Sequence, residues 1–338
     1  MERQVYRLKA GSIDRLSISR ETLPEPGPQE VTVAVQAIGL NFADIFAVWG
    51  LYSATPEGPF VPGLEYAGEI LRVGSAVSAW KPGDRIMGVT RFGAYATHLN
   101  IDSRYVVRLP GEWTFDTGAA YLVQVLTAYY GLRYLGNLEE GQTVLIHSAA
   151  GGVGILANRI AKKYGAFTIG TVGSQAKVDW CQSEDYDRVI VRSRDFEKKL
   201  LEALGDRPLQ LIMECIGGKI LQTSYDHLAP EGRMVVFGSA RYTSQSDRPN
   251  YPRLLWQFLT RPRIDPQEMT NRNVSVLGFN LIYLYEKADL MHRLLQELEA
   301  LELPPPHVGH TFSFADLPDA IRLFRTGETV GKVVVRTG

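Results

Sequence analysis

The sequence contains 338 residues, which at roughly 150 residues per domain predicts about two domains. Hydrophobic residues make up 45% of it and charged residues 22%, a composition that excludes an intrinsically disordered chain. The 36 Lys and Arg residues nearly balance the 37 Asp and Glu residues, so the net charge of -1 excludes a general attraction to nucleic acid or to an anionic membrane.

The cysteine content and the apolar stretches indicate the setting of the protein. Cys181 and Cys215 form no CxxC pair, which excludes a disulfide framework and a cysteine-rich zinc site. The longest apolar stretch, residues 119–132, is too short to span a bilayer, and the N-terminus lacks the apolar centre of a signal peptide. We therefore expect a soluble, cytoplasmic protein without a transmembrane segment.

The first third of the chain consists of short segments separated by Gly and Pro, as in residues 24–28, 59–63 and 81–84. Between the first two of these, apolar residues alternate with a period of two from Val31 to Ala37, which is typical of a half-buried strand. This part of the sequence predicts an irregular all-β unit.

From Thr143 onward, short apolar runs alternate with helical patterns, which predicts a parallel sheet with crossover helices. After the first run, apolar residues recur at helical spacing from Val153 to Tyr164, and Gly165 ends the pattern. The strands are expected at residues 143–147, 167–172, 188–191, 209–215, 234–238 and 274–279.

The alternation is interrupted by residues 241–273, which contain four prolines around an apolar and basic middle. We interpret this segment as an insertion with one short helix. A helix over about residues 287–301 and a strand over 332–336 should then return to the first unit.

Residues 143–154 (TVLIHSAAGGVG) read as a strand, a glycine turn and the start of a helix. Backbone amides at such a helix terminus can bind a pyrophosphate closely, because Gly151 and Gly152 have no side chains in the way. Ala149 stands where the glycine pattern has its first glycine, but the strand and helix context favours dinucleotide binding over an ordinary turn. The expected pyrophosphate-binding residues are Ala150, Gly151, Gly152 and Val153.

The end of the second strand indicates which dinucleotide binds. An NAD enzyme places Asp or Glu there to bind the ribose hydroxyls, whereas this chain has Gly173, Ser174 and Lys177, with Arg192 after the third strand. Two cations and a serine could hold a 2'-phosphate, which predicts NADPH. Arg192 has a second possible role, that of a solvated surface residue.

Several motifs, taken together and in order, resemble those of a known family. The motifs are residues 39–44 (GLNFAD), 50–52 (GLY), 62–68 (PGLEYAG), Gly74, 81–85 (KPGDR) and 149–154 (AAGGVG). With them the sequence resembles the medium-chain dehydrogenase/reductase superfamily, in its zinc-free quinone oxidoreductase branch. The insertion and residues 278–281 (GFNL) resemble the part of that branch that includes the synaptic-vesicle membrane protein homologues, and the polyketide enoyl reductases are close relatives.

The resemblance implies an α/β protein with two domains. Residues 123–279 would form a Rossmann-type, doubly wound parallel sheet that binds NADPH, with the insertion at about 241–273. Residues 1–122 and 280–338 would form a GroES-like irregular β-barrel that carries the catalytic groups. The resemblance also implies a homodimer in which the strand at 274–279 pairs with its copy.

The same resemblance addresses zinc. Zinc alcohol dehydrogenases of the superfamily have Cys where Asn41 stands and His where Leu64 stands, and neither of the present residues is a credible zinc ligand. His307 and His310 follow three prolines and are interpreted as loop residues, and His147 as a packed residue rather than a base. No metal is expected.

By resemblance, Asn41, Tyr52 and Thr127 line the cleft between the domains, near the nicotinamide. Tyr52 could donate a proton to an enolate, or it could form only an aromatic wall of the pocket. Lys332 could reach the cofactor phosphates or be a solvated strand lysine. The residues expected to close over the nicotinamide ring are Phe237, Gly238, Ser239, Phe279 and Asn280.

Three functional readings follow. The first is an NADPH-dependent, zinc-independent reductase of a quinone or of the β-carbon of an α,β-unsaturated carbonyl. The second is an enoyl reductase whose acyl substrate arrives on a carrier protein. The third is a cofactor-binding protein whose insertion docks a membrane or a partner. The sequence names neither the substrate nor the proton donor, because the expected pocket is largely apolar.

Overall fold

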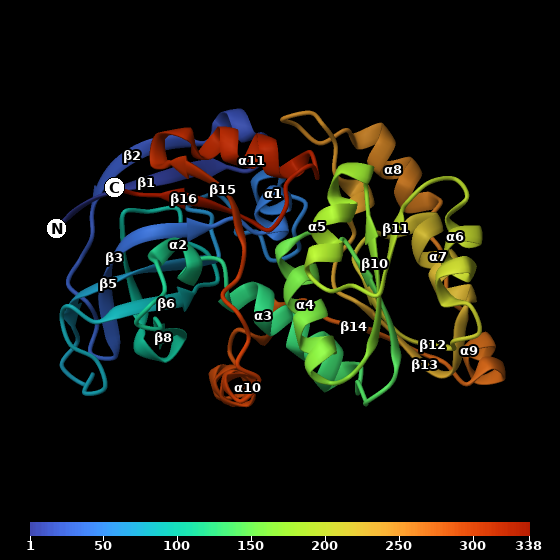
Figure 1. The fold of residues 1–338 in the computed structure, drawn as a ribbon. Helices are drawn as coiled ribbons and strands as arrows, with labels where there is room; N and C mark the ends of the chain where they lie inside the picture. The colour runs from blue at the N-terminus through green and yellow to red at the C-terminus, as the bar shows by residue number, and fades with distance from the viewer.

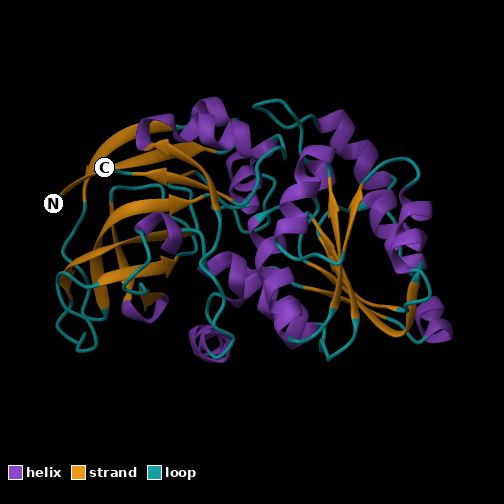
Figure 2. Cartoon of the chain, in the orientation of Figure 1, coloured by secondary structure: helices purple, strands orange, loops and turns teal.

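The computed structural model describes residues 1–338, which form two lobes side by side (Figure 1). One lobe holds both ends of the chain and is rich in strands, and the other consists of a parallel sheet with helices on both faces (Figure 2). The expected combination of an irregular β unit with a parallel α/β unit is confirmed.

The strand-rich lobe contains two sheets. A three-stranded sheet has the order β2-β1-β4, and a larger sheet has the order β15-β16-β3-β5-β6-β8, with β7 pairing on β3. The alternating segment predicted around Val31 lies in β3, where its apolar side chains are buried. The strands are β1 (Glu2–Lys9), β2 (Ser17–Thr22), β3 (Glu30–Gly39), β4 (Pro59–Phe60), β5 (Glu65–Val73), β6 (Arg85–Val89), β7 (His98–Asp102), β8 (Val106–Arg108), β15 (Val308–Ser313) and β16 (Lys332–Arg336).

The parallel sheet has six strands in the order β11-β10-β9-β12-β13-β14. The order reverses between β9 and β12, which is the place where sheets of this kind bind ligands at the carboxyl ends of their strands. The strands are β9 (Thr143–His147), β10 (Phe167–Val172), β11 (Arg188–Val191), β12 (Leu209–Glu214), β13 (Leu228–Val236) and β14 (Ser275–Gly278).

Helices cover the sheets and join the lobes. The largest cluster of buried side chains includes Ala37 and Ala67 of the first lobe, Val125 of α3 and Val144 of the parallel sheet, so the two lobes share a core. The helices are α1 (Phe42–Trp49), α2 (Phe115–Gly118), α3 (Leu122–Tyr129), α4 (Gly152–Lys163), α5 (Val178–Ser183), α6 (Phe196–Leu204), α7 (Gly218–Asp226), α8 (Tyr251–Leu259), α9 (Pro266–Arg272), α10 (Ala288–Glu299) and α11 (Leu317–Arg325).

The insertion differs from the expectation, because residues 241–273 contain two helices rather than one. Asn250 caps the start of α8, and Asp265 caps the start of α9 with Pro266 in its first turn. Two of the four prolines that broke the sequence pattern, Pro252 and Pro266, therefore lie in the first turns of helices. No helix of the structure has both the length and the apolar character that a membrane span requires.

Candidate active site

The glycine turn lies between β9 and α4, at the position where the strand order reverses. Its backbone turns sharply, because Ser148 adopts a left-handed conformation with φ 54° and its carbonyl accepts a hydrogen bond from the Gly151 amide. A Cβ atom on Gly154 would lie 2.4 Å from the Ser148 oxygen, so only glycine fits there. The amides of Gly152 and Val153 begin α4 and have no acceptor within the helix, which suits them to an anion.

The next strand, β10, ends beside Arg192. Arg192 donates from its guanidinium to the Thr171 carbonyl at 3.0 Å and to the Thr171 hydroxyl at 2.9 Å. A Cβ atom on Gly173 would lie 3.4 Å from the same guanidinium, so the charge lies close to the end of β10. Arg192 is thus held in place rather than freely solvated, and Ser174 beside it is exposed.

Lys177 lies at the same edge but is already engaged. Its ammonium donates to the carbonyl oxygens of Gly327 at 2.6 Å and Thr329 at 2.7 Å, and the residue is buried. These contacts join the nucleotide-binding edge to the segment that precedes β16. To reach a phosphate, the ammonium would have to leave two carbonyl partners.

A buried polar chain lies beneath the strand ends, and sequence reasoning did not find its members as a group. The His147 ring contacts the Thr171 hydroxyl at 2.8 Å through Nδ1, and through Nε2 it contacts the Glu214 carboxylate at 3.1 Å. Burial lowers the pKa of His147 to about 3, so the ring is neutral at pH 7. Burial also raises the pKa of Glu214 to about 7, although this carboxylate accepts hydrogen bonds from the amides of Ile216 and Gly217. His147 is therefore a packed residue, as expected.

Asn41 lies at the centre of a second buried network. Its side-chain oxygen accepts from Nζ of Lys332 at 2.9 Å and from Nε2 of Gln124 at 2.7 Å. Its side-chain nitrogen donates to the Gly39 carbonyl at 3.1 Å and to Glu65 at 3.4 Å. The carboxamide thus uses both of its acceptor positions and both of its donor positions within the protein.

Lys332 is neither solvated nor directed to open space. Its ammonium forms an ion pair with Glu65 at 2.7 Å, with side-chain exposures of 3% and 0%. Removing one member of such a buried pair is costly, because the other charge is left uncompensated. Glu65 is part of the PGLEYAG motif, but its partner comes from a strand 267 residues further on, so sequence spacing alone could not pair them.

Tyr52 and Asn280 were both expected near the nicotinamide. They come from distant parts of the chain and are in contact. The Tyr52 hydroxyl donates to the side-chain oxygen of Asn280 at 2.7 Å. Burial raises the pKa of Tyr52 to about 12, so the phenol stays protonated at neutral pH. A second contact lies beside it, where the Tyr283 hydroxyl donates to Ser53 at 2.7 Å.

Among the remaining predicted residues, Phe237, Gly238, Ser239 and Phe279 follow the carboxyl ends of β13 and β14, whereas Thr127 lies in α3. The amide of Phe237 donates to the Glu214 carbonyl, and the amide of Phe279 donates to the Val236 carbonyl. The rings of Phe237 and Phe279 stack with centroids 6.2 Å apart. Gly238 packs beside Cys215, and Ser239 follows it. The hydroxyl of Thr127 donates to the Val123 carbonyl of its own helix at 2.6 Å.

The structure contains no group of three or more His, Cys, Asp or Glu side chains that could hold a metal ion. Leu64 is buried, and Asn41 is fully hydrogen-bonded as described. The two positions at which zinc ligands were sought thus present a hydrocarbon side chain and a saturated amide.

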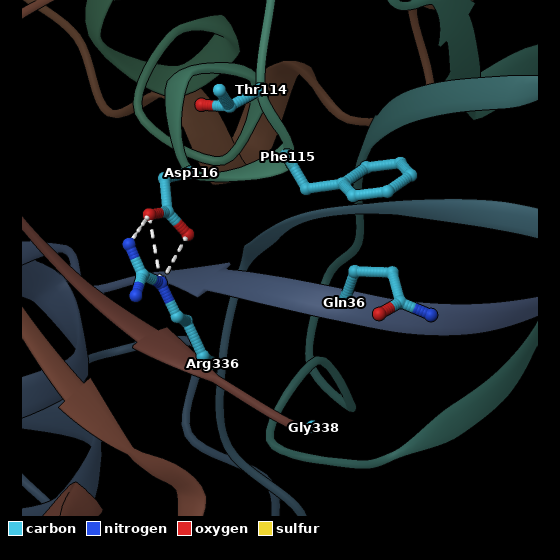
Figure 3. A pocket seen from close by; sticks show the side chains of 6 residues that line it. All are labelled: Gln36, Thr114, Phe115, Asp116, Arg336 and Gly338. Carbon is cyan, nitrogen blue, oxygen red and sulfur yellow. Dashed lines mark hydrogen bonds and ion pairs between the residues drawn. The ribbon is translucent and has the colours of Figure 1, made fainter.

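A surface depression of about 280 Å³ lies away from this site (Figure 3). It is lined by Gln36 of β3, Phe115 and Asp116 of α2, and Arg336 of β16, and an ion pair between Asp116 and Arg336 crosses it. The depression is wide open, and the two charged side chains that line it pair with each other. It offers no arrangement for chemistry.

Two family models match separate parts of the chain. Residues 27–111 match the family described as alcohol dehydrogenase GroES-like domain, and residues 152–297 match the family described as zinc-binding dehydrogenase. Among curated proteins, the chain is 31% identical over 319 residues to the human synaptic vesicle membrane protein VAT-1 homolog, covering 93% of this chain and 81% of the relative.

Solved structures agree with these matches. Escherichia coli quinone oxidoreductase complexed with NADPH superposes with a TM-score of 0.86 at 26% identity and covers all of both chains. The CurK enoyl reductase superposes with a TM-score of 0.84 at 27% identity and covers 99% of both chains. The chain is therefore similar over its full length both to a quinone oxidoreductase and to an enoyl reductase.

Proposed function

Because this chain belongs to the medium-chain dehydrogenase/reductase superfamily, we propose that it is an NADPH-dependent reductase that transfers hydride to a quinone or to the β-carbon of an α,β-unsaturated carbonyl, without zinc. The observation that carries the proposal is the edge between β9 and β10. There a glycine turn with free helix amides lies next to Arg192, and no acidic side chain follows β10.

The residues present fit NADPH. The amides of Gly152 and Val153 would bind the pyrophosphate, and Arg192 with Ser174 would bind the 2'-phosphate through charge-assisted hydrogen bonds. When bound, the cofactor supplies the hydride. The relative that is solved with NADPH supports the same choice of cofactor.

The side chains of the protein would orient the substrate and supply a proton to it. Tyr52 holds its proton at neutral pH and is oriented by Asn280, so it would donate a hydrogen bond or a proton to the enolate oxygen or carbon of a reduced enone. Phe237 and Phe279 would form the apolar wall that excludes water. The Asn41 carboxamide has no donor or acceptor left for a substrate, because all of its positions are hydrogen-bonded within the protein. We therefore assign Asn41 to holding Lys332 and Gln124 rather than to contact with the substrate.

The reductase proposal is tested by NADPH oxidation with three substrates: a small quinone, a simple enone and an enoyl thioester. Turnover of the quinone or enone supports it. Turnover of the thioester alone would favour the carrier-bound substrate, which similarity to the CurK enoyl reductase also supports. No turnover of any of the three would overturn the proposal.

Zinc independence is tested separately. Because Asn41 and Leu64 offer no zinc ligands, prolonged chelation should leave turnover and the thermal midpoint unchanged. One zinc ion per chain by elemental analysis would contradict this expectation.

A second candidate function is supported by helix α8. Five of its nine side chains are large, apolar and more than half exposed: Tyr251, Leu255, Trp256, Phe258 and Leu259. Arg253 lies within the helix, and Arg261 and Arg263 follow it, which is the composition of a helix that lies on an anionic membrane. Co-sedimentation with vesicles containing anionic lipid tests this role, and the Trp256→Asp variant should lose binding. Absence of binding by the parent protein would overturn it.

A further inference from the structure

The segment between β13 and α8 reaches from the parallel-sheet lobe to the strand-rich lobe, where it lies near α1 and α11 (Figure 1). Asp247 makes the contacts. Its backbone carbonyl accepts hydrogen bonds from the Trp49 indole at 2.9 Å and from the Ile13 amide at 3.1 Å. We call residues 243–250 the clasp.

The Asp247 side chain anchors the clasp by charge. Its carboxylate accepts a hydrogen bond from Nε of Arg322 at 3.0 Å and lies 2.7 Å from a guanidinium nitrogen of Arg325. Both arginines belong to α11, and the Arg325 side chain is only 9% exposed. Arg322 also reaches Asp14 and Asp319. A partly shielded, charge-assisted arrangement of this kind fixes the position of the carboxylate and with it the adjacent carbonyl.

Trp49, whose indole donates to the Asp247 carbonyl, is close in sequence to Tyr52. Trp49 is the last residue of α1 and is 2% exposed, and Gly50 ends the helix in a left-handed conformation. The Tyr52 amide then bonds back to the Phe46 carbonyl, so the tyrosine is tied to the last turn of α1. Beyond this turn, Asn280 holds the Tyr52 hydroxyl from the other side.

We propose that Asp247 is a positioning residue that acts through Trp49 on Tyr52. The clasp fixes the end of α1, and Asn280 holds the phenol of Tyr52. Together these contacts fix the position of the Tyr52 hydroxyl relative to the substrate. The proposal rests on the proposed function, because it is there that Tyr52 supplies the proton. It gives the insertion a role that the parallel sheet alone does not require.

Amide hydrogen exchange tests the clasp without any substrate. In Asp247→Ala, exchange of the amides of residues 46–53 should rise at least about tenfold, because loss of charge-assisted contacts shifts the local opening equilibrium. Trp49→Phe, which keeps the aromatic packing and removes the indole donor, should give a rise in the same amides. Asp319→Ala is the matched control, because Asp319 pairs with the same Arg322 but lies outside the clasp.

Turnover separates positioning from general weakening. In Asp247→Ala and Trp49→Phe, kcat with an enone should fall about tenfold, whereas the Kd for NADPH should stay within about twofold, because neither residue contacts the glycine turn. Unchanged exchange in both variants, or an equal change in Asp319→Ala, would overturn the proposal. So would an unchanged kcat. A parent protein without any turnover would overturn the proposed function instead, and the exchange data would then decide on the clasp alone.

Discussion

Arg192 and Lys177 are the two cations at the end of β10, and the structure treats them differently. Arg192 is fixed beside Gly173, whereas the Lys177 ammonium is bound to two carbonyls of the opposite lobe. Arg192→Ala should therefore weaken NADPH binding at least about tenfold and leave NADH binding unchanged, since a charge-assisted contact contributes roughly 1.5 to 3 kcal/mol.

Lys177→Ala should weaken NADPH binding less than Arg192→Ala does, and it should lower the thermal midpoint because two hydrogen bonds between the lobes are lost. Titration of each variant with both cofactors measures these effects. Equal losses for NADPH and NADH in Arg192→Ala would show that the guanidinium does not read the 2'-phosphate.

Tyr52 gives a prediction that depends on substrate. Because burial raises the pKa of Tyr52 to about 12, the pH profile of kcat should show no inflection from this group between pH 6 and 9. Tyr52→Phe should lower kcat for an enone about a hundredfold, the lower range of general acid catalysis. Quinone reduction should change much less, because the oxygens of a hydroquinone exchange protons directly with water. A similar loss for both substrates would argue for a purely spatial role of the ring.

At the scale of elements, the carboxyl end of β12 carries a group that should control stability. Burial raises the pKa of Glu214 from 4.5 to about 7, so between these values the folded protein retains a proton that the unfolded chain has released. This contribution stabilises the protein at low pH and is lost as the pH rises toward 7. Neighbouring His147 has the opposite effect on stability below pH 6.5. Because burial lowers its pKa to about 3, the unfolded chain binds a proton there that the folded protein does not, and the free energy of unfolding falls as the pH falls.

Glu214→Gln removes the Glu214 contribution and keeps the size of the side chain. The free energy of unfolding of the variant, relative to the parent, should therefore increase by about 2 kcal/mol between pH 5 and pH 7. Urea unfolding at the two pH values measures the change. Glu202→Gln, on an exposed face of α6, is the control and should show no such change. A constant difference between Glu214→Gln and the parent would contradict the assignment.

The elements themselves were largely predictable from the sequence, for a physical reason. A buried parallel strand needs a continuous apolar run, and all six runs formed strands. Five of them lie within one residue of the expected bounds, whereas β13 was expected at 234–238 and begins at Leu228. The insertion was harder, because its second helix, α9, has no buried face to produce a pattern and is defined by its cap at Asp265. Its contacts with the strand-rich lobe, through Asp247, involve residues far apart in the chain: Trp49 is 198 positions away and Arg322 is 75.

In the candidate site, too, features set by the local sequence could be predicted, whereas contacts between distant residues could not. Gly151, Gly152 and Arg192 could be proposed as cofactor-binding residues from the sequence, because each lies next to a strand end whose local geometry limits what it can bind. The partners of Asn41 could not be found in this way, because Glu65, Gln124 and Lys332 come from three distant segments. Their hydrogen bonds exist only once these segments are packed together.

At the scale of the whole molecule, β14 forms one edge of the parallel sheet and pairs only with β13. A bare edge of this kind can pair with a second copy, so we predict a homodimer with one continuous sheet. Val276→Pro removes a backbone donor from β14 and should shift the protein toward single chains, while Val276→Thr keeps the donor and should not. Light scattering at micromolar concentration measures this. A parent protein with the mass of one chain and full activity would end the dimer prediction.

The position of β16 has a consequence for how the protein is made. This strand lies inside the larger sheet of the first lobe, between β15 and β3, although nearly 300 residues separate it from β3 in the chain. During synthesis, the parallel sheet can close as soon as β14 has left the ribosome, whereas the lobe that was translated first must wait for residues 308–336. The half of the enzyme that begins the chain is thus the half that finishes folding last, and until then the edge of β3 that β16 will cover remains exposed to chaperones.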